Sequence, residues 1–156
     1  MKKSDKIINN KLLNKDEFKS LKIRFLRKKD ILFFSALCQD SIFSKDEIYF
    51  DKSNKTLITT FSRFCWEYQS SELNNSTFYR VVSGFRICNV NEVIYENFEK
   101  LKSLEFFSLL SVSYKKNIIT LHFSCNVDIK IFITKIDIFL DDLDIPWPTI
   151  RKPQHK

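Results

Sequence analysis

Glycine is almost missing from this chain. Its 156 residues include one glycine, Gly84, together with three prolines, two histidines and four cysteines. Loops that bind phosphates or dinucleotides depend on glycine, because its backbone adopts left-handed conformations and lets a ligand approach closely. The composition therefore excludes glycine-rich nucleotide-binding loops and indicates few other kinds of functional site.

Paired cysteines and long apolar runs are missing as well. Cys38, Cys65, Cys88 and Cys125 are separated by 27, 23 and 37 positions, without the close spacing of zinc or redox sites. We expect reduced, buried cysteines, and neither a metal nor another cofactor. Residues 1–15 lack the apolar run of a secretory signal, and no window reaches the roughly 18 apolar residues of a membrane helix. We therefore expect a cytoplasmic protein.

Apolar side chains are plentiful. Hydrophobic residues make up 44% of the chain and include sixteen phenylalanines. A chain of this length buries one sizeable core, so one domain is expected. We predict a basic, flexible extension over residues 1–20, a single α+β domain over residues 21–150 and a basic tail over residues 151–156.

Positive charge is concentrated at the N-terminal end. Residues 1–29 hold eleven Lys or Arg against three acidic residues, a net charge of +8, whereas residues 30–150 carry −4. Such a segment could neutralise nucleic-acid phosphates, and it could equally be a disordered, solubilising tail. The candidate nucleic-acid contacts, at the start of the predicted domain, are Lys22, Arg24, Arg27, Lys28 and Lys29.

The first predicted elements are a short strand and one helix. Leu21–Leu26 alternates apolar with basic residues, as a half-buried strand does. Asp30 is a candidate N-cap for a helix that begins at Ile31 and presents an apolar face about three turns long. Polar residues from Gln39 to Ser41 should end it.

The rest of the chain has the period of two that is typical of strands. Hairpins are predicted for Ile48–Asp51 with Thr56–Trp66, and for Phe107–Tyr114 with Ile118–Cys125. Tyr79–Val90 and Glu92–Glu96 are also predicted to be extended, with Gly84 as a bulge or a point of close contact.

A change of parity interrupts the last predicted strand. Ile129, Ile131 and Ile133 alternate, and the apolar pattern then resumes at Ile136. We interpret this as one strand with a bulge, and the start of a short helix is the alternative. The expected fold is α+β: an antiparallel sheet of about six or seven strands packed with one N-terminal helix. A partly open barrel of pleckstrin-homology type is the alternative geometry.

Five residues around two predicted strands form the first candidate ligand site. They are Arg63, Trp66, Glu67, Arg80 and Arg86. Guanidinium groups pair with carboxylates or phosphates and stack on rings, so this set could hold an anionic or planar ligand. The alternative is structural, with Arg63 and Glu67 paired across strands and the Trp66 ring in the core.

The C-terminal tail offers a second candidate set, Trp147, Arg151 and His155, which follows acidic residues at positions 141, 142 and 144. Carboxylates near a histidine could bind a hard metal or transfer a proton. A proline-containing tail holds such groups poorly, so the alternative is a solvated acidic turn that Trp147 anchors to the domain. His122, on the polar side of its predicted strand, is expected to be an exposed histidine.

Several blocks of the sequence resemble a known family. The blocks are Asp30–Asp40, Ser62–Glu67, Ser83–Arg86, Leu109–Val112, Asp141–Trp147 and Lys152–His155. In this order they look like the family called domain of unknown function 2948, over about residues 21 to 155. The resemblance implies a small cytosolic protein, mainly of alphaproteobacteria, with no assigned activity. The lysine-rich start departs from the family, as does Asp144 at a position where relatives usually have glycine.

Three hypotheses about function follow. The first is a non-catalytic binding or adaptor domain with an unknown protein partner, because strands are predicted throughout and no catalytic set converges. The second is an RNA- or ribosome-associated protein that uses the basic N-terminus and exposed aromatic residues on strands. The third is an enzyme of unrecognised type, whose groups only the fold brings together. The oligomeric state stays open.

Overall fold

The computed structural model describes residues 18–68, 77–102 and 105–154. These ranges contain one α-helix, α1 (Ile31–Cys38), and eleven strands. The strands are β1 (Lys22–Phe25), β2 (Ile42–Ser44), β3 (Ile48–Asp51), β4 (Thr56–Phe64), β5 (Phe78–Ile87), β6 (Val90–Glu96), β7 (Phe106–Lys115), β8 (Ile118–Phe123), β9 (Asp128–Ile133), β10 (Ile138–Asp142) and β11 (Trp147–Thr149). The predicted α+β fold on an antiparallel sheet is confirmed, but six or seven strands was too few.

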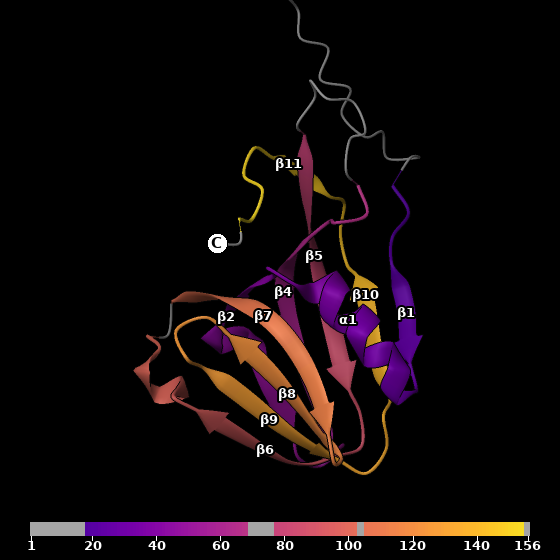
Figure 1. Ribbon diagram of the computed structural model, residues 1–156, viewed down its shortest axis with the longest axis vertical. Helices are drawn as coiled ribbons and strands as arrows, with labels where there is room; N and C mark the ends of the chain where they lie inside the picture. Colours follow the sequence, from indigo (N-terminus) through magenta and orange to yellow (C-terminus); the bar gives the residue numbers. More distant parts are fainter. Residues whose placement is uncertain (1–17, 69–76, 103–104, 155–156) are drawn as a thin grey trace, which may run out of the picture.

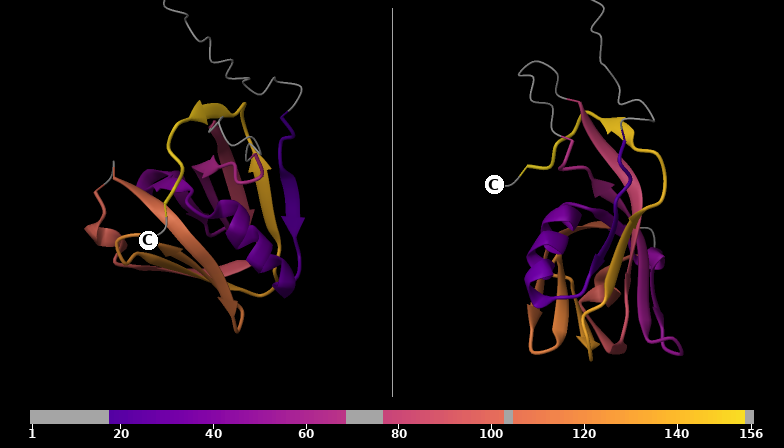
Figure 2. Two further views of the ribbon diagram at one scale, coloured as in Figure 1. Left: turned by 45° about the horizontal axis from the view of Figure 1, so that its top comes forward. Right: turned by 90° about the vertical axis from the view of Figure 1, so that its right-hand side faces the viewer.

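The strands form two layers that face each other (Figures 1 and 2). Layer A has the order β1-β10-β5-β4-β2, with β3 added beside β4 and β11 beside β5, and layer B has the order β7-β8-β9-β6. The short strand β2 joins the layers, because Ile42 pairs with both Ser62 of β4 and Ser108 of β7. The end strands β1 and β6 are not paired with each other, so the sheet does not close into a barrel.

Helix α1 lies in the open side between β1 and β7 (Figure 2). It ends at Cys38, close to the predicted end, but at eight residues it is shorter than three turns. Asp30 precedes it without capping it. The Asp30 carboxylate instead accepts a hydrogen bond from the backbone N–H of Arg27 at 3.2 Å, while the Asp30 N–H donates to the Arg27 carbonyl at 2.9 Å and closes the 3₁₀ turn Lys28–Asp30.

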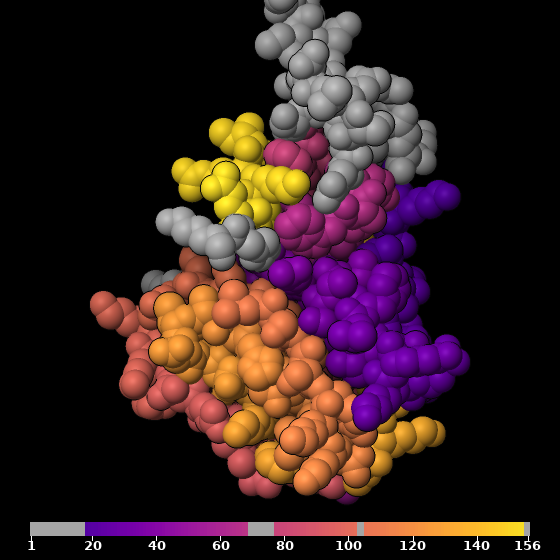
Figure 3. Space-filling view, in the orientation of Figure 1, coloured from indigo at the N-terminus to yellow at the C-terminus, as the bar shows by residue number. Residues whose placement is uncertain are grey.

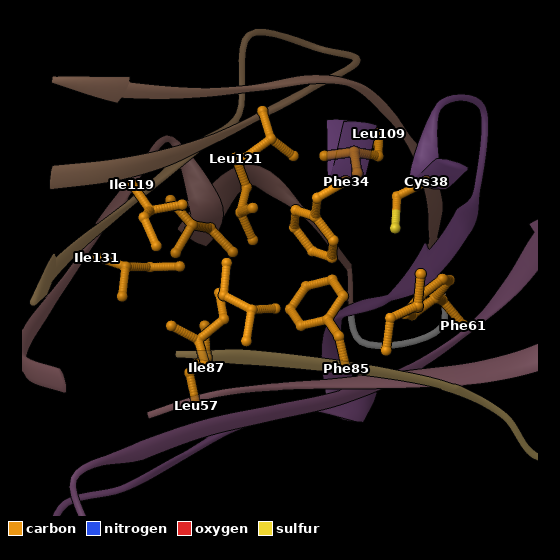
Figure 4. Packing of buried hydrophobic residues seen from close by; sticks show 14 of the residues in the cluster. Phe34, Cys38, Leu57, Phe61, Phe85, Ile87, Leu109, Ile119, Leu121 and Ile131 are labelled. Atoms are coloured by element: carbon orange, nitrogen blue, oxygen red, sulfur yellow. The ribbon is translucent and has the colours of Figure 1, made fainter. Parts of the chain in front are cut away.

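The hydrophobic core fills the space between the layers (Figure 4). Phe34 of α1 is fully buried and meets Phe85 of layer A edge-on, with 5.4 Å between the ring centroids. On the layer B side, Leu109 and Leu121 point toward the same ring. Each such side chain contributes roughly 1.5–3 kcal/mol by leaving water. The core is therefore shared by both layers and the helix.

The parity change after Ile133 marks a crossing between layers, so the predicted single bulged strand is wrong. The chain leaves layer B at the end of β9 and enters layer A at Ile138, the start of β10. The backbone N–H of Thr134 donates to the carbonyl of Asn89 at 3.1 Å, beside the opposite crossing from β5 to β6. Because β9 and β10 belong to different layers, the residues that face the core are determined separately for each strand. The apolar alternation therefore shifts between them.

Gly84 is a point of close contact and not a bulge. Its pairing with Thr60 of β4 and Asp141 of β10 is uninterrupted. A Cβ atom there would lie 3.2 Å from the carbonyl oxygen of Thr59 and 3.3 Å from Cδ1 of Leu143. The left-handed backbone positions belong to other residues. Lys116 and Asn117, both with positive φ, form the two-residue turn between β7 and β8.

The prediction missed two three-residue strands. One is β2, and the other is β11, in a segment that was expected to be a proline-containing tail next to a solvated acidic turn. Trp147 of β11 pairs with Arg80 of β5, so pairing with the sheet holds this segment on layer A. Asp144, between β10 and β11, does not have a positive φ, and its carboxylate accepts a hydrogen bond from the N–H of Ile145 at 2.7 Å.

Candidate functional site

Layer A separates the first predicted site into two groups. Side chains alternate along a strand, so Arg63 of β4 points into the core, whereas Arg80 and Arg86 of β5 point outward. The register agrees, because Arg80 is opposite Phe64 and Arg86 is opposite Ile58, both outward positions. The structure therefore brings Arg63 and Glu67 together, but it does not bring them together with Arg80 and Arg86.

Arg63 is fully buried in a network of charged groups. Its two terminal nitrogens donate to Glu67 Oε1 and Oε2 at 2.7 and 2.9 Å, and Nε and Nη2 donate to Asp142 at 3.1 and 2.9 Å. Asp142 also accepts hydrogen bonds from the Ser83 hydroxyl at 2.6 Å and the Leu21 backbone at 2.9 Å.

The Arg63 network is satisfied internally. Burial alone lowers the pKa of Arg63, but hydrogen bonds and charges from Glu67 and Asp142 outweigh it, so the net pKa is raised and the guanidinium stays charged. Four N–H···O contacts reach these two carboxylates, out of five N–H groups on a guanidinium. Arg63 therefore has little capacity left for a ligand, and its geometry fits a structural role.

Trp66 and Arg80 hold the segment that follows α1. The Trp66 indole donates to the carbonyl of Gln39 at 3.0 Å. Arg80 donates to the carbonyls of Ser62 at 3.1 Å and Asp40 at 3.3 Å, and its guanidinium lies 5.4 Å from the centre of the Phe64 ring. Burial lowers the pKa of Arg80. Both side chains thus fix local backbone.

Arg86 and Arg24 share one aromatic ring on the outer face of layer A. Their guanidinium carbons lie 4.5 and 4.9 Å from the centre of the Phe139 ring. Asp137 holds Arg24 at 2.9 Å, and this hydrogen bond lowers the pKa of Asp137. Lys22, the neighbouring outward residue of β1, faces the same side. All three basic side chains are exposed.

The remaining predicted nucleic-acid contacts lie elsewhere. Lys28 and Lys29 are exposed residues of the 3₁₀ turn before α1, and Arg27, also exposed, is the N-cap of that turn. In the tail, Trp147 and Arg151 are exposed, and His155 lies outside the described residues. The described ranges contain no group of three or more His, Cys, Asp or Glu that could hold a metal.

The cysteines differ from the expectation of four buried thiols. Cys38 and Cys65 are buried, whereas Cys88 is half-buried and Cys125 is exposed. Burial raises the pKa of Cys65 to about 12 and raises the pKa of Cys38 as well. Cys125 is exposed because it occupies a turn with positive φ and not a strand position.

Sequence reasoning missed a groove between α1 and β7. It has a volume of about 580 Å³ and is lined by Ile31, Leu32, Val112 and Tyr114, with Lys28, Lys29 and Ser113 also contributing. Figure 3 shows α1, in indigo, against the orange strands of layer B on this face. The sequence signal was available: the helix ILFFSALC carries no charged residue on any side.

The edge of β7 beside this groove is only partly paired. Strand β2 pairs with Phe106–Ser108. Further along, the backbone N–H of Val112 donates to the Ser35 hydroxyl of α1 at 2.8 Å. Among the described strands, none pairs with this edge of residues 112–115. The groove therefore combines apolar side chains with a strand edge.

These features define a class: a small α+β domain of two facing antiparallel layers, closed on one side by an apolar helix. No described helix has the length and apolar character needed to cross a membrane. The chain belongs to the family described as Protein of unknown function (DUF2948), whose model matches residues 21–155. No curated protein and no solved structure matches the chain.

Proposed function

We propose that this chain is a protein-binding domain of adaptor type, and that α1 with its groove holds an extended segment of a partner protein. One observation carries the proposal. Helix α1 is apolar on its outward side as well as on its core side, and Leu32 and Phe33 are 80% and 55% exposed. A helix that is apolar all round is normally buried.

The outward side of α1 consists of Leu32, Phe33 and Ala36, and we call these three residues the α1 face. The core side already has its partners, because Phe34 packs against Phe25 and Phe85. The α1 face is therefore not required by the core of this chain. Covering Leu32 or Phe33 with a partner would contribute roughly 1.5–3 kcal/mol each.

Charge and backbone indicate the chemistry of the partner segment. Lys28 and Lys29 line the groove, so acidic side chains are favoured beside the apolar ones. The partly paired edge of residues 112–115 favours an extended backbone, because an added strand would gain main-chain hydrogen bonds. The expected ligand is an extended peptide in which acidic and apolar residues alternate.

A displayed peptide library tests this function with the full-length chain as bait. We expect selected peptides to be rich in Asp or Glu and in large apolar residues. Leu32→Asp should weaken their binding at least tenfold, measured by fluorescence anisotropy of a labelled synthetic peptide. Ile150→Asp is the matched control, because Ile150 is 92% exposed and lies outside the α1 face. Equal affinity of the two variants for the selected peptides would contradict the proposal.

A second candidate function is binding of single-stranded RNA on the outer face of layer A. The observation that favours it is the stacking of Arg24 and Arg86 on Phe139, next to Lys22. Guanidinium planes stack on bases, and basic residues contact phosphates.

Binding of a uridine 20-mer to the full-length chain, measured at several salt concentrations, tests the RNA function. We expect affinity that falls steeply with salt and that falls further in Arg86→Ala. Lys100→Ala removes an exposed charge elsewhere and serves as the control. If Arg86→Ala and Lys100→Ala bind equally, the outer face of layer A is not the RNA site.

A further inference from the structure

Three polar side chains form a hydrogen-bonded chain on the outward face of layer B. Ser113 of β7, His122 of β8 and Asp128 of β9 lie on three neighbouring strands. The Ser113 hydroxyl is 2.9 Å from Nε2 of His122, and Nδ1 of His122 is 3.1 Å from Oδ1 of Asp128. The three residues are separated by nine and six positions in the sequence, and they do not form a recognisable sequence motif.

The order of these contacts suits base-assisted attack by a serine. A carboxylate only accepts hydrogen bonds, so the neutral His122 ring carries its proton on Nδ1, toward Asp128. Nε2 is then the acceptor and takes the hydrogen bond from the Ser113 hydroxyl. This is the arrangement of nucleophile, base and orienting carboxylate that recurs on unrelated folds.

The sheet holds these groups in place. His122 is paired directly with Asp128 across β8 and β9, and with Ser111 across β7 and β8. Ser113 is the next residue of β7 on the same face, so it is the diagonal neighbour of His122. Positions on paired strands are better fixed than positions on loops.

Ser113 also lies at the edge of a groove that a small acyl group could enter. This second groove, about 400 Å³ in volume, is lined by Ser113 and by three large apolar side chains, Ile94, Ile118 and Phe132. Lys115 and Lys116 line it too, and ammonium groups stabilise developing negative charge on oxygen. Lys130, also in the lining, is paired with Glu96 at 2.7 Å. Both a site for an apolar acyl chain and cationic donors are therefore next to the hydroxyl.

We propose that Ser113, His122 and Asp128 form a site that hydrolyses small carboxylic esters, with Ser113 as nucleophile, His122 as general base and Asp128 as a positioning residue. The Ser113 oxygen attacks the ester carbonyl while His122 takes its proton. The C–O bond to the alcohol then breaks, and His122 returns the proton to that alcohol. Water, deprotonated by His122, attacks the acyl-serine and releases the carboxylic acid and free Ser113.

This activity goes beyond the proposed function and would make the expectation of a domain without catalytic residues wrong. It does not depend on the α1 face, although Ser113 also lines the groove beside α1. His122→Gln separates the two, because His122 lines neither groove, so this variant should lower ester hydrolysis and leave peptide binding unchanged.

The full-length chain incubated with p-nitrophenyl butyrate, and separately with phenylmethanesulfonyl fluoride, provides the test. We expect intact-mass and peptide measurements to place one sulfonyl group on Ser113. Ester hydrolysis should fall at least tenfold in Ser113→Ala and in His122→Gln. In Asp128→Asn we expect a lower kcat with an unchanged KM, and in Ser111→Ala, the matched exposed serine, no change.

Two results would overturn the assignment. One is the absence of sulfonylation at Ser113 in folded protein. The other is hydrolysis that His122→Gln lowers but Ser113→Ala does not, because the imidazole would then attack the ester itself. Thermal unfolding of each variant should match the parent chain, since all three side chains are at least partly exposed.

Discussion

At the scale of single residues, Arg63 shows how far sequence reasoning reaches. The sequence interpretation paired it with Glu67 across strands, whereas the two residues lie on one segment, four positions apart. The second partner, Asp142, is 79 positions away and was grouped with the tail. Only the packing of β10 beside β5 brings Asp142 to Arg63. Residue identity also does not distinguish a buried arginine from an exposed one.

Removal of Arg63 should be costly. Arg63→Met leaves the fully buried carboxylate of Asp142 without its counter-ion. Breaking a buried pair on one side costs about 3–5 kcal/mol. Urea unfolding followed by circular dichroism measures this loss. Arg86→Met, which replaces an exposed arginine, should lower the free energy of unfolding by about 1 kcal/mol or less. A similar loss in both variants would show that the Arg63 network contributes little.

Thiol reactivity should follow the raised pKa values of the buried cysteines. Alkylation needs the thiolate, and a pKa of about 12 at Cys65 leaves very little thiolate at pH 8. We expect iodoacetamide at pH 8 to modify Cys125 first and Cys88 more slowly. Cys38 and Cys65 should react only in urea, and mass spectrometry of peptides gives the order. Rapid modification of Cys65 in folded protein would contradict the burial.

At the scale of elements, the alternation of apolar residues was the reliable signal. It located both hairpins and β1, because a strand with one buried face must alternate. It could not locate β2 and β11, since three residues are too few to show a period. It also misjudged the crossing after Ile133, because a bulge and a change of layer shift parity in the same way.

The turn between β7 and β8 should become more stable with glycine. Lys116 has φ of 48°, in the left-handed region where a Cβ atom is disfavoured. Lys116→Gly removes that strain at the expense of chain entropy, for a net gain of about 0.5–1 kcal/mol. Lys52→Gly, in the other hairpin turn without a positive φ, should gain nothing in the same urea unfolding measurement. Equal effects would refute the strain argument.

At the scale of the whole molecule, the face of the layer on which each side chain lies determines which residues can form a site together. The sequence shows which arginines, serines and histidines the chain contains, but it does not show which of them share a face of a layer. Ser113, His122 and Asp128 meet because β7, β8 and β9 are neighbours in register. Arg63 and Arg80 separate because they lie on opposite faces of layer A. Strand order is a property of long-range pairing, which periodicity does not report.

The boundary of the domain can be placed by truncation. The first contacts in the described residues are those of the Phe18 ring, whose centroid lies 5.6 Å from that of Tyr68, and of the Lys19 N–H, which donates to the Tyr68 hydroxyl. Ser20 and Leu21 then donate to Asp142. A chain that begins at Phe18 should therefore keep the unfolding free energy of the full chain. A chain that begins at Lys22 should lose about 1–3 kcal/mol, because the buried Asp142 carboxylate loses the hydrogen bond from the Leu21 N–H. Urea unfolding of both chains decides between this boundary and a later one.

The place of β1 at the edge of layer A also bears on synthesis of the chain. Its described strand partner is β10, and the pair Phe25 with Ile138 is separated by 113 positions. A ribosome that adds about 5–20 residues per second needs on the order of ten seconds for that stretch. Layer B, from Val90 to Ile133, is translated completely within that interval. We expect the strands of layer B to pair in the nascent chain before β10, the partner of β1, has been synthesised.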